Sequence, residues 1–366
     1  MWIVMGLVVA LLVATFNGAN DNFKGFATIW GADILSFKQS LFLSTLATVL
    51  GGLLSIYLAG NLLSVFSGKE IITVDRFVQV NLLLSVSLGA LITLILATLM
   101  GFPISTTHAL LGGLVGAGLG IPQAELHWHK ISTLFILPLL FNPFVSALTV
   151  FLFNKSTSKN KSTAACVCLV NELEHIAMGD AAALTSSNIK SIKPRILYSN
   201  TGCANELVKF SNKQLVDYLH PTSAFLISFS RGVNDTPKLA SLLLIIPFLT
   251  NRLSIMLVVL MMAIGGYLYS KKVATTMSKK ITPINHVNGI KANLTTAFLV
   301  LIASHFGLPV STTHVAVGSI TGIALTENNS INKQIIYQIL MSWILTLPVS
   351  MTIAYLAVHI LNSWTV

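Results

Sequence analysis

Apolar runs alternate with short polar stretches along most of the chain. Before residue 154 the apolar runs fall near 1–17, 25–35, 40–66, 79–100, 103–121 and 131–153. After residue 220 they fall near 221–230, 239–249, 253–270, 290–306, 309–326 and 335–361. Because a helix needs about 20 apolar residues to cross a bilayer, the pattern predicts an all-α transmembrane bundle of about ten spans. Several runs are too short to cross alone, and the polar stretch 231–238 between two of them predicts a helix broken inside the membrane.

The composition excludes most other classes of protein. Of 366 residues, 54% are hydrophobic and only 9% are charged, whereas a soluble domain averages about 25% charged residues. The high hydrophobicity also excludes a disordered chain, and the weak alternation with period two argues against an outer-membrane barrel. The first apolar run has no basic flank and no clear cleavage site, so it predicts a membrane helix rather than a signal peptide. We therefore expect a multi-pass protein of the cell (inner or plasma) membrane.

The net charge of +10 is explained by where the charges lie, without a nucleic-acid partner. Residues 154–220 combine eight basic with five acidic residues and lack a span-length apolar run, which predicts a hydrophilic loop on the cytoplasmic side. This loop contains the three cysteines, Cys166, Cys168 and Cys203. Cys166 and Cys168 with nearby His175 suggest a metal site, but the second pair typical of zinc sites is missing. Free thiols are the favoured interpretation.

Two polar motifs occur twice, in the same order. Gly, Asn, Asp and Lys recur between the segments Gly18-Ala19-Asn20-Asp21-Asn22-Phe23-Lys24 and Gly232-Val233-Asn234-Asp235-Thr236-Pro237-Lys238, at an offset of 214 residues. Six of eight positions are identical between Gly101-Phe102-Pro103-Ile104-Ser105-Thr106-Thr107-His108 and Gly307-Leu308-Pro309-Val310-Ser311-Thr312-Thr313-His314, at an offset of 206. Such recurrence indicates an internal duplication. We predict an N-terminal repeat at 1–153, the loop at 154–220 and a C-terminal repeat at 221–366.

The connector charges predict that the two repeats have opposite orientations. The connector 271–280 contains four lysines and no acid, which indicates the cytoplasmic side. The charges in its counterpart 67–78 balance to zero, which indicates the external side. We therefore expect an inverted-topology repeat with broken helices, re-entrant hairpins and both termini outside. Secondary transporters are built in this way and bind substrate near the midplane, between the two halves.

The first motif places ionisable residues in an apolar context in each half, at Asn20, Asp21 and Lys24 and at Asn234, Asp235 and Lys238. An ionisable group in the bilayer is expensive and is usually paired or functional. The amide and carboxylate oxygens suit a hard cation such as sodium, and the aspartates are equally able to carry a proton. Each lysine follows its aspartate by three residues, so it can neutralise that carboxylate or attract an anion. The alternative is a purely structural ion pair, which the symmetric duplication disfavours.

The second motif contains residues suited to binding an anion: Ser105, Thr106, Thr107 and His108, and Ser311, Thr312, Thr313 and His314. The preceding prolines end one helix and the serines are good N-caps for the next. Free first-turn amides, the helix dipole and the threonine hydroxyls then suit a small tetrahedral oxyanion. The histidines can donate a bond or titrate with substrate, or simply bond to a neighbouring carbonyl. For the threonine hydroxyls, the alternative is that each bonds to a backbone carbonyl of its own helix.

Two other classes of function remain as alternatives. Ser105 and His108 are three residues apart, which suggests a hydrolase. However, no third orienting carboxylate is adjacent and the G-x-S-x-G pattern is absent, so we expect no enzyme and no cofactor. An anion channel needs a continuous pore, whereas these motifs predict a closed site at the midplane.

The two Asn-Asp motifs and the two Pro-x-Ser-Thr-Thr-His segments resemble the inorganic phosphate transporter (PiT) family over nearly the whole chain. The resemblance implies import of phosphate by alternating access, coupled to sodium or protons; a few relatives carry sulfate, so a sulfate permease is the runner-up. It implies that Asn20, Asp21, Asn234 and Asp235 bind the coupling cation and the substrate. It further implies a phosphate and cation cradle of Ser105, Thr106, Thr107, Ser311, Thr312 and Thr313.

The sequence departs from the family pattern after the first aspartate. Many members have small residues there, as in Asn-Asp-x-Ala-Asn-Ala, whereas this chain has Asn22-Phe23-Lys24-Gly25. A fixed Lys24 ammonium near the cation site can replace a sodium ion, so sodium and proton coupling both stay open. The expected partners are phosphate or sulfate, the coupling cation and the lipid bilayer. A homodimer is common for such repeats, but the sequence does not support it.

Overall fold

The computed structural model describes residues 2–74, 79–122, 124–158, 166–173, 192–199, 206–244, 246–281, 286–326 and 332–363. The chain divides into two compact units. The membrane unit comprises Met1–Lys155 and His220–Val366, and the loop unit comprises Ser156–Leu219. Each unit is described by itself.

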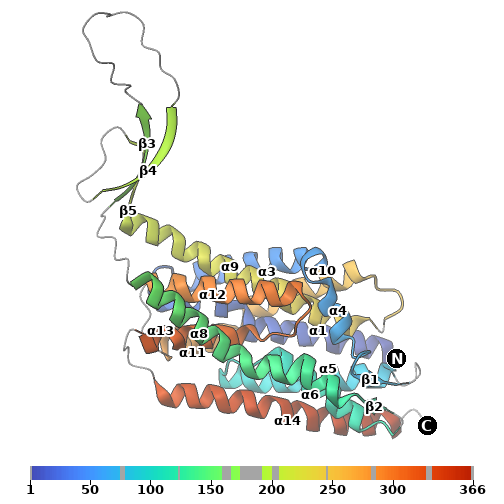
Figure 1. The fold of residues 1–366 in the computed structure, drawn as a ribbon. Coiled ribbons are helices and arrows are strands. Elements are labelled where there is room, and N and C mark those ends of the chain that lie inside the picture. The colour runs from blue at the N-terminus through green and yellow to red at the C-terminus, as the bar shows by residue number, and fades with distance from the viewer. Residues whose placement is uncertain are drawn as a thin grey trace, which may run out of the picture. The chain divides into compact units, whose positions relative to one another are not determined.

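The membrane unit is built almost entirely of helices (Figure 1). Its N-terminal half contains α1 (Trp2–Asp21), a 3-10 turn (Asn22–Phe26), α2 (Ala27–Gly31), α3 (Phe37–Leu58), α4 (Gly60–Phe66), β1 (Ile72–Thr73), α5 (Gln79–Met100), α6 (Thr106–Leu119), β2 (Glu125–Leu126), α7 (Trp128–Lys130), a π-helical turn (Ile131–Ile136) and α8 (Leu137–Ser158). The C-terminal half contains α9 (Asn212–Ala240), a 3-10 turn (Ser241–Leu243), α10 (Asn251–Tyr269), α11 (Lys271–Lys279), α12 (His286–His305), α13 (Thr312–Thr326) and α14 (Lys333–Ser363).

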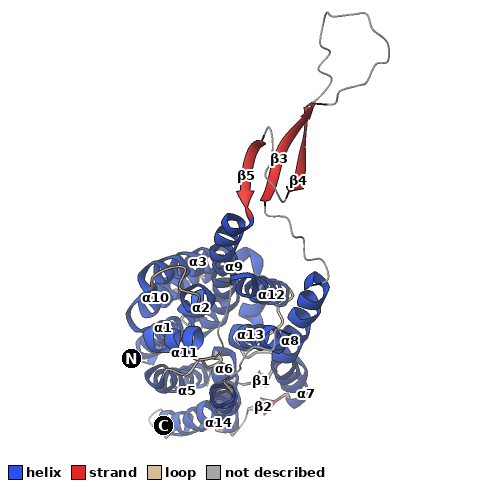
Figure 2. Ribbon diagram, turned by 90° about the vertical axis from the view of Figure 1, so that its left-hand side faces the viewer, coloured by secondary structure: helices blue, strands red, loops and turns tan. Residues whose placement is uncertain are grey.

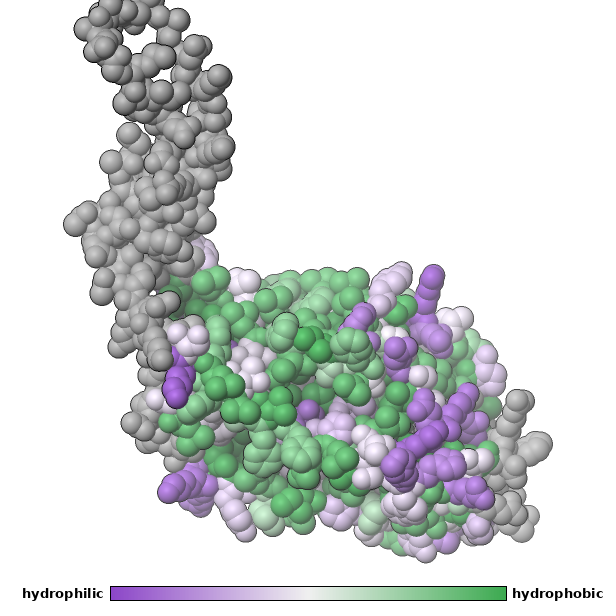
Figure 3. Space-filling view, in the orientation of Figure 1, coloured by the Kyte–Doolittle hydropathy of each residue, from purple (hydrophilic) through white to green (hydrophobic). Residues whose placement is uncertain are grey.

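Among the described residues, seven helical segments are long and apolar enough to cross a membrane: Trp2–Gly31, Phe37–Leu58, Gln79–Met100, Trp128–Ser156, Asn251–Tyr269, His286–His305 and Lys333–Ser363. Large apolar side chains such as Phe144 and Ile344 are exposed on their outer faces. Figure 3 shows hydrophobic residues over most of the visible face of this unit, with hydrophilic residues gathered near the end that carries β1 and β2. The prediction of a multi-span helical bundle is confirmed.

The helix that carries each copy of the first motif behaves differently in the two halves. In the N-terminal half, α1 ends at Asp21 and the chain continues as a 3-10 turn, as expected for a broken helix. In the C-terminal half the predicted break at 231–238 is wrong, because α9 continues to Ala240 with Pro221 and Pro237 inside it. A proline removes a single backbone donor, and the polar side chains at 231–238 point into a buried polar site, so the helix has no need to unwind.

Helices α5 and α6 form a hairpin that returns to the end where it started. β1 precedes α5 and β2 follows α6, and the two strands pair antiparallel, with Ile72 opposite Leu126. The His127 amide also donates to the Ile71 carbonyl (2.9 Å). Both ends of this hairpin therefore lie together.

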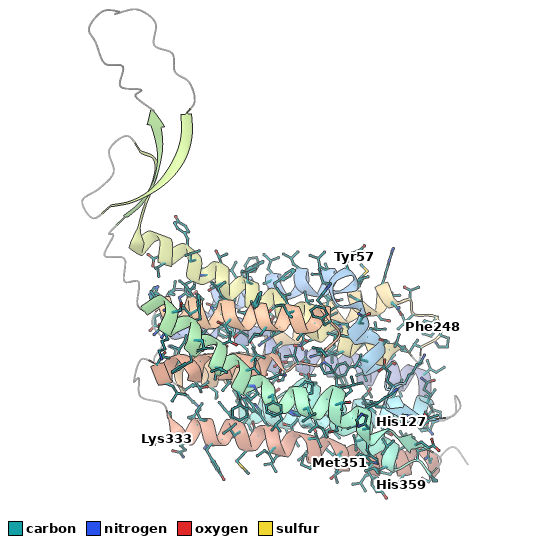
Figure 4. All side chains as sticks on the ribbon, viewed as in Figure 1. Tyr57, His127, Phe248, Lys333, Met351 and His359 are labelled. Carbon is teal, nitrogen blue, oxygen red and sulfur yellow. The ribbon has the colours of Figure 1, made fainter. Side chains whose placement is uncertain are left out.

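Helices α12 and α13 form a second hairpin of the same kind. The Asn332 amide, after α13, donates to the Ile281 carbonyl, before α12 (3.1 Å). Figure 4 places Lys333, the residue after Asn332, at one end of the membrane unit and His127 at the opposite end. The two hairpins therefore open toward opposite ends.

The two hairpins also turn in the same way at their tips. Gly101 and Gly307, which are equivalent in the repeat, have φ angles of +76° and +70°, the left-handed region that favours glycine after a helix. The following amides, of Phe102 and Leu308, donate back to carbonyls in the last turn of α5 and α12 (2.9 and 2.8 Å). Each proline then directs the chain into the short helix of its hairpin.

Helix α6 is enclosed by neighbouring helices, with α5 and α14 beside it (Figure 2). A side chain at Gly112 or Gly116 would collide with the backbone carbonyl of Leu347 or Met351 on α14. Small residues allow such close helix packing in membranes, so these glycines hold the first hairpin tightly against α14.

The loop unit contains β3 (Cys166–Leu173), β4 (Ile192–Ser199) and β5 (Glu206–Ser211), which form an antiparallel sheet in the order β4-β3-β5. These strands were not predicted from the sequence, because span-length apolar runs contain no signal of pairing between distant segments. Cys203 and His175, which entered the thiol and metal interpretations, lie outside the described residues. The cytoplasmic side of this segment stays a prediction.

Candidate functional site

The tips of the two hairpins meet and bond to each other symmetrically. The Thr107 hydroxyl donates to the Val310 carbonyl (3.2 Å), and the Thr313 hydroxyl donates to the Ile104 carbonyl (3.0 Å). Thr107 and Thr313 are equivalent in the repeat, as are Ile104 and Val310. These contacts bring together the N-terminal ends of α6 and α13, which carry the positive ends of the helix dipoles.

The serines of the second motif cap these two helices, as predicted. The Ser105 Oγ accepts from the His108 amide (3.2 Å), and the Ser311 Oγ accepts from the His314 amide (3.3 Å). Each cap satisfies one of the amides that the first helical turn leaves without a backbone partner. The serines thus fix the direction of the two helices at the point where the tips meet.

Lys24 joins the broken helix of the N-terminal half to both hairpin tips. Its Nζ donates to the Asp21 carboxylate, to the Ile104 carbonyl (3.0 Å) and to the Thr313 hydroxyl (2.7 Å). An ammonium group has three N–H donors. All three are therefore used within the protein.

Lys238 repeats this arrangement from the other half. Its Nζ donates to the Asp235 carboxylate (3.4 Å), to the Val310 carbonyl (2.7 Å) and to the Thr107 hydroxyl (3.0 Å). Each of these partners is the repeat equivalent of a partner of Lys24. The predicted Asp–Lys pairing is therefore present in both halves, and each lysine also contacts a threonine of the opposite half.

Asn20 anchors the helix break to the first hairpin. Its side-chain amide donates to the Thr98 hydroxyl (3.2 Å) and to the Phe102 carbonyl (3.0 Å). Its oxygen accepts from the Ile104 amide (3.2 Å). Asn20 therefore fixes the backbone of the first tip, and its oxygen already accepts one hydrogen bond.

Asn234 has a related but not identical role. Its oxygen accepts from the Ser304 hydroxyl (3.0 Å), and Ser304 is the repeat equivalent of Thr98. Its side-chain amide donates to Asp235 Oδ1 (2.8 Å) and to the Val310 carbonyl (3.3 Å). Thr98 and Ser304 were not predicted, although they recur at the same offset of 206 residues as the second motif.

The symmetry ends at the residue four positions before each aspartate. In the N-terminal half this is Asn17, whose oxygen accepts from the Thr106 hydroxyl (2.5 Å); that hydroxyl also lies 3.1 Å from Asp21 Oδ2. In the C-terminal half it is Arg231, which is fully buried. Within the described part of the chain, the three guanidinium nitrogens of Arg231 have no hydrogen-bond partner. Asp235 Oδ2 has none among the described residues either. Neither position was predicted from the sequence, although both lie one helical turn from the motif on the same face.

The predicted site residues are buried together, apart from His108, which is partly exposed. Thr312, at the start of α13, is 4% exposed, and it lies between Ser311 and Thr313, both of which are also buried. The site thus encloses two carboxylates and three basic side chains, since Arg231 adds to the two lysines. Charges at this depth in a membrane protein are costly and indicate a functional site.

The two histidines lie together, but not with the aspartates. The rings of His108 and His314 are 4.7 Å apart, and His314 stacks on Trp343 at 3.8 Å. His314 Nδ1 bonds with the Leu139 carbonyl (3.2 Å), and the same residues line an apolar cavity between α6, α8, α13 and α14. This arrangement fits the alternative in which a histidine bonds to a neighbouring carbonyl.

Comparison with known proteins agrees with this geometry. The profile of the phosphate transporter family matches residues 17–354. A candidate phosphate permease of Thermococcus kodakarensis is 27% identical over 96% of this chain and 96% of its own. The chloroplastic inorganic phosphate transporter 2-1 of Arabidopsis thaliana is 26% identical over 92% of this chain and 68% of its own.

A solved structure, that of a sodium-dependent phosphate transporter, matches 99% of both chains with a TM-score of 0.78 at 20% identity, so the two share a fold. The resemblance noted from the two pairs of motifs is confirmed by the family profile. The protein is accordingly a multi-pass membrane transporter and not an enzyme. Since the matched region includes both copies of both motifs, the chain belongs to the phosphate transporter family.

Proposed function

We propose that this protein imports inorganic phosphate by alternating access and couples the import to sodium or protons. The observation that carries the proposal is the joined pair of hairpin tips, held by Lys24 and Lys238 through mirrored contacts to Thr313 and Thr107. A buried, symmetric site between two halves is the arrangement that secondary transporters use. Family membership supports phosphate as the substrate.

An inverted-topology repeat is part of this proposal. The hairpins are equivalent in sequence, they turn at equivalent glycines and they open toward opposite ends of the membrane unit. Rocking of one half against the other would open the site first to one side and then to the other. A homodimer stays a prediction.

Substrate binding and opening are linked through the threonines at the tips. In this conformation the hydroxyls of Thr107 and Thr313 donate to carbonyls of the opposite tip. A phosphate oxygen that accepts from either hydroxyl would replace one of these carbonyls. Binding would therefore loosen the contact between the tips, which is the step that alternating access requires.

The coupling cation is assigned to the C-terminal half of the site. Lys24 donates to Asp21 Oδ1, and the Thr106 hydroxyl lies 3.1 Å from Asp21 Oδ2, so both oxygens of this carboxylate have a donor nearby. Asp235 Oδ2 has no hydrogen-bond partner among the described residues. A carboxylate oxygen is a suitable ligand for sodium and an acceptor for a proton, so Asp235 fits either coupling ion.

The test is uptake of radiolabelled phosphate into proteoliposomes that contain the purified protein. A sodium gradient and a proton gradient are imposed separately, and empty liposomes are the control. We expect accumulation above equilibrium under one of the two gradients. Absence of gradient-driven accumulation under both would refute the proposal.

A competition experiment separates the substrates. We expect a tenfold excess of sulfate to leave most phosphate uptake intact. Complete inhibition by sulfate, together with direct uptake of radiolabelled sulfate, would assign the protein as a sulfate permease instead.

A further inference from the structure

Among the described residues, Arg231 is the one basic side chain of the site whose nitrogens have no hydrogen-bond partner. We propose that Arg231 is the residue that binds the transported oxyanion directly, through its guanidinium group, and that the substrate lies on the C-terminal side of the site. This inference rests on the proposed function and adds a substrate-binding residue to it.

The two lysines are unsuited to this task in the conformation observed. Lys24 already donates to Asp21, Ile104 and Thr313. The Lys238 ammonium likewise has three acceptors within the protein. Since an ammonium has three N–H groups, neither lysine has a donor left for an anion.

Arg231 lies in the site and not beside it. It is one helical turn before Asp235 on α9, so the two side chains share a face of the helix. Its guanidinium interacts electrostatically with Asp235, and also with Asp21 and Lys24 of the other half. The group therefore lies near the charges of both half-sites.

The burial of Arg231 calls for an anionic partner. The side chain is fully buried, and none of its three guanidinium nitrogens has a hydrogen-bond partner in the described ranges. A buried cation without hydrogen bonds is strongly unfavourable. A guanidinium fork matches two oxygens of a phosphate in a bidentate geometry, so one bound oxyanion would satisfy the donors that the protein leaves open.

The asymmetry of the repeat indicates the side on which the substrate lies. The equivalent of Arg231 is Asn17, which is neutral and accepts from Thr106. A single phosphate bound by Arg231 therefore lies off the pseudo-twofold axis. It is close to Asp235, whose free carboxylate oxygen needs a cation or proton before an anion can approach.

The test compares three variants of the purified full-length protein: Arg231→Gln, Arg231→Lys and Arg252→Gln. Arg252 is exposed near the start of α10, so its variant removes the same charge outside the site. Binding of inorganic phosphate is measured by titration calorimetry, and the melting temperature is measured without phosphate. Titration of the wild-type protein first establishes whether it binds phosphate.

We expect Arg231→Gln to weaken phosphate binding by about 30-fold or more, because a buried charge contact is lost. Arg231→Lys keeps the charge but not the fork and should weaken binding by about tenfold. Without phosphate, Arg231→Gln should raise the melting temperature by about 2 °C or more, since an unpaired buried cation is removed. Arg252→Gln should match the wild type in both measurements.

Three results would overturn this assignment. Phosphate binding by Arg231→Gln equal to that of the wild type would show that Arg231 does not contact the substrate. A lower melting temperature together with unchanged affinity would show that Arg231 has a structural role. A wild type that binds no phosphate would overturn the proposed function and this inference with it.

Discussion

At the scale of single residues, the site is held by two aspartate–lysine pairs, one from each half. Lys24 and Lys238 sit at the hairpin tips, where each bonds to its own aspartate and to a threonine of the opposite half. An aspartate–lysine pair three residues apart is often only structural. Here each lysine also bonds to a threonine of the opposite half. The geometry of each aspartate–lysine pair therefore depends on the distance between the two hairpin tips.

Asp21→Asn and Asp235→Asn should each abolish gradient-driven phosphate uptake. Each change leaves a buried lysine without its carboxylate partner, which is unfavourable by about 3–5 kcal/mol. If this cost falls on the conformation that transports phosphate, uptake decreases by at least about 100-fold. Uptake into proteoliposomes measures the loss, and membrane insertion should be normal. The matched control is Asp33→Asn, because Asp33 is exposed and pairs with Lys279 outside the site (3.6 Å). Normal uptake by both site variants would reduce the aspartates to structural roles.

Thr107→Val and Thr313→Val should also lower uptake, and by similar factors, because each removes one contact between the tips and one partner of a lysine. We expect a decrease of about 30-fold or more for each, since one neutral and one charge-assisted hydrogen bond are lost, together about 2–4 kcal/mol. Initial uptake rates measure it. Thr149→Val is the control, because that hydroxyl donates to the Val145 carbonyl of its own helix (2.7 Å), outside the site. A large effect of one threonine alone would contradict the mirrored roles.

At the scale of elements, the hairpins are positioned by close backbone packing. The first hairpin approaches α14 along Gly112 and Gly116, where a methyl group would meet a backbone carbonyl. The tips are therefore held by helices that have little freedom to shift. Although α6 is short, this packing against α14 fixes the position of the polar residues at its N-terminal end.

Gly116→Ala should destabilise the fold by about 1–3 kcal/mol, as overpacking of a tight contact does. Thermal unfolding in detergent measures the effect as a lower melting temperature. Gly60→Ala is the matched control, because Gly60 has no atom within 4 Å of the added methyl group. An equal melting temperature for the two variants would show that α6 and α14 separate easily.

At the scale of the whole molecule, two halves of one chain meet at a shared site while their hairpins open in opposite directions. Residues near His127 and near Lys333 lie at opposite ends of the membrane unit (Figure 4). The basic connector 271–280 and the neutral connector 67–78 predict which end faces the cytoplasm. Under the proposed function, movement of the two halves would open the site to one side of the membrane and then to the other.

His127→Cys and Lys333→Cys should react with a membrane-impermeant thiol reagent from opposite sides. The measurement uses oriented vesicles and a chain in which Cys166, Cys168 and Cys203 are replaced by serine. Lys333→Cys should be labelled from the cytoplasm, and His359→Cys, which lies at the same end as His127, should be labelled from outside. Labelling of all three from one side would exclude the inverted topology.

Much of the site was predictable because it repeats. Asn20, Asp21 and Lys24 stand out by their charge in an apolar context, and their copies at an offset of 214 mark them as a pair of half-sites. Asn17 and Arg231 stand at the same offset of 214 residues. Because one is an asparagine and the other an arginine, residue identity does not mark them as equivalent. Thr98 and Ser304 were missed for a similar reason, because they lie inside apolar runs.

The sequence by itself determined the membrane class, the duplication and the serine caps. These depend on composition, on the recurrence of whole motifs and on spacing within one helical turn, respectively. Only the tertiary structure decided that α9 continues through its polar stretch and that each lysine reaches a threonine of the opposite half. It alone revealed that Arg231 is left without a partner among the described residues. These features depend on packing between residues more than a hundred positions apart, and local spacing contains no information about which donors such packing will satisfy.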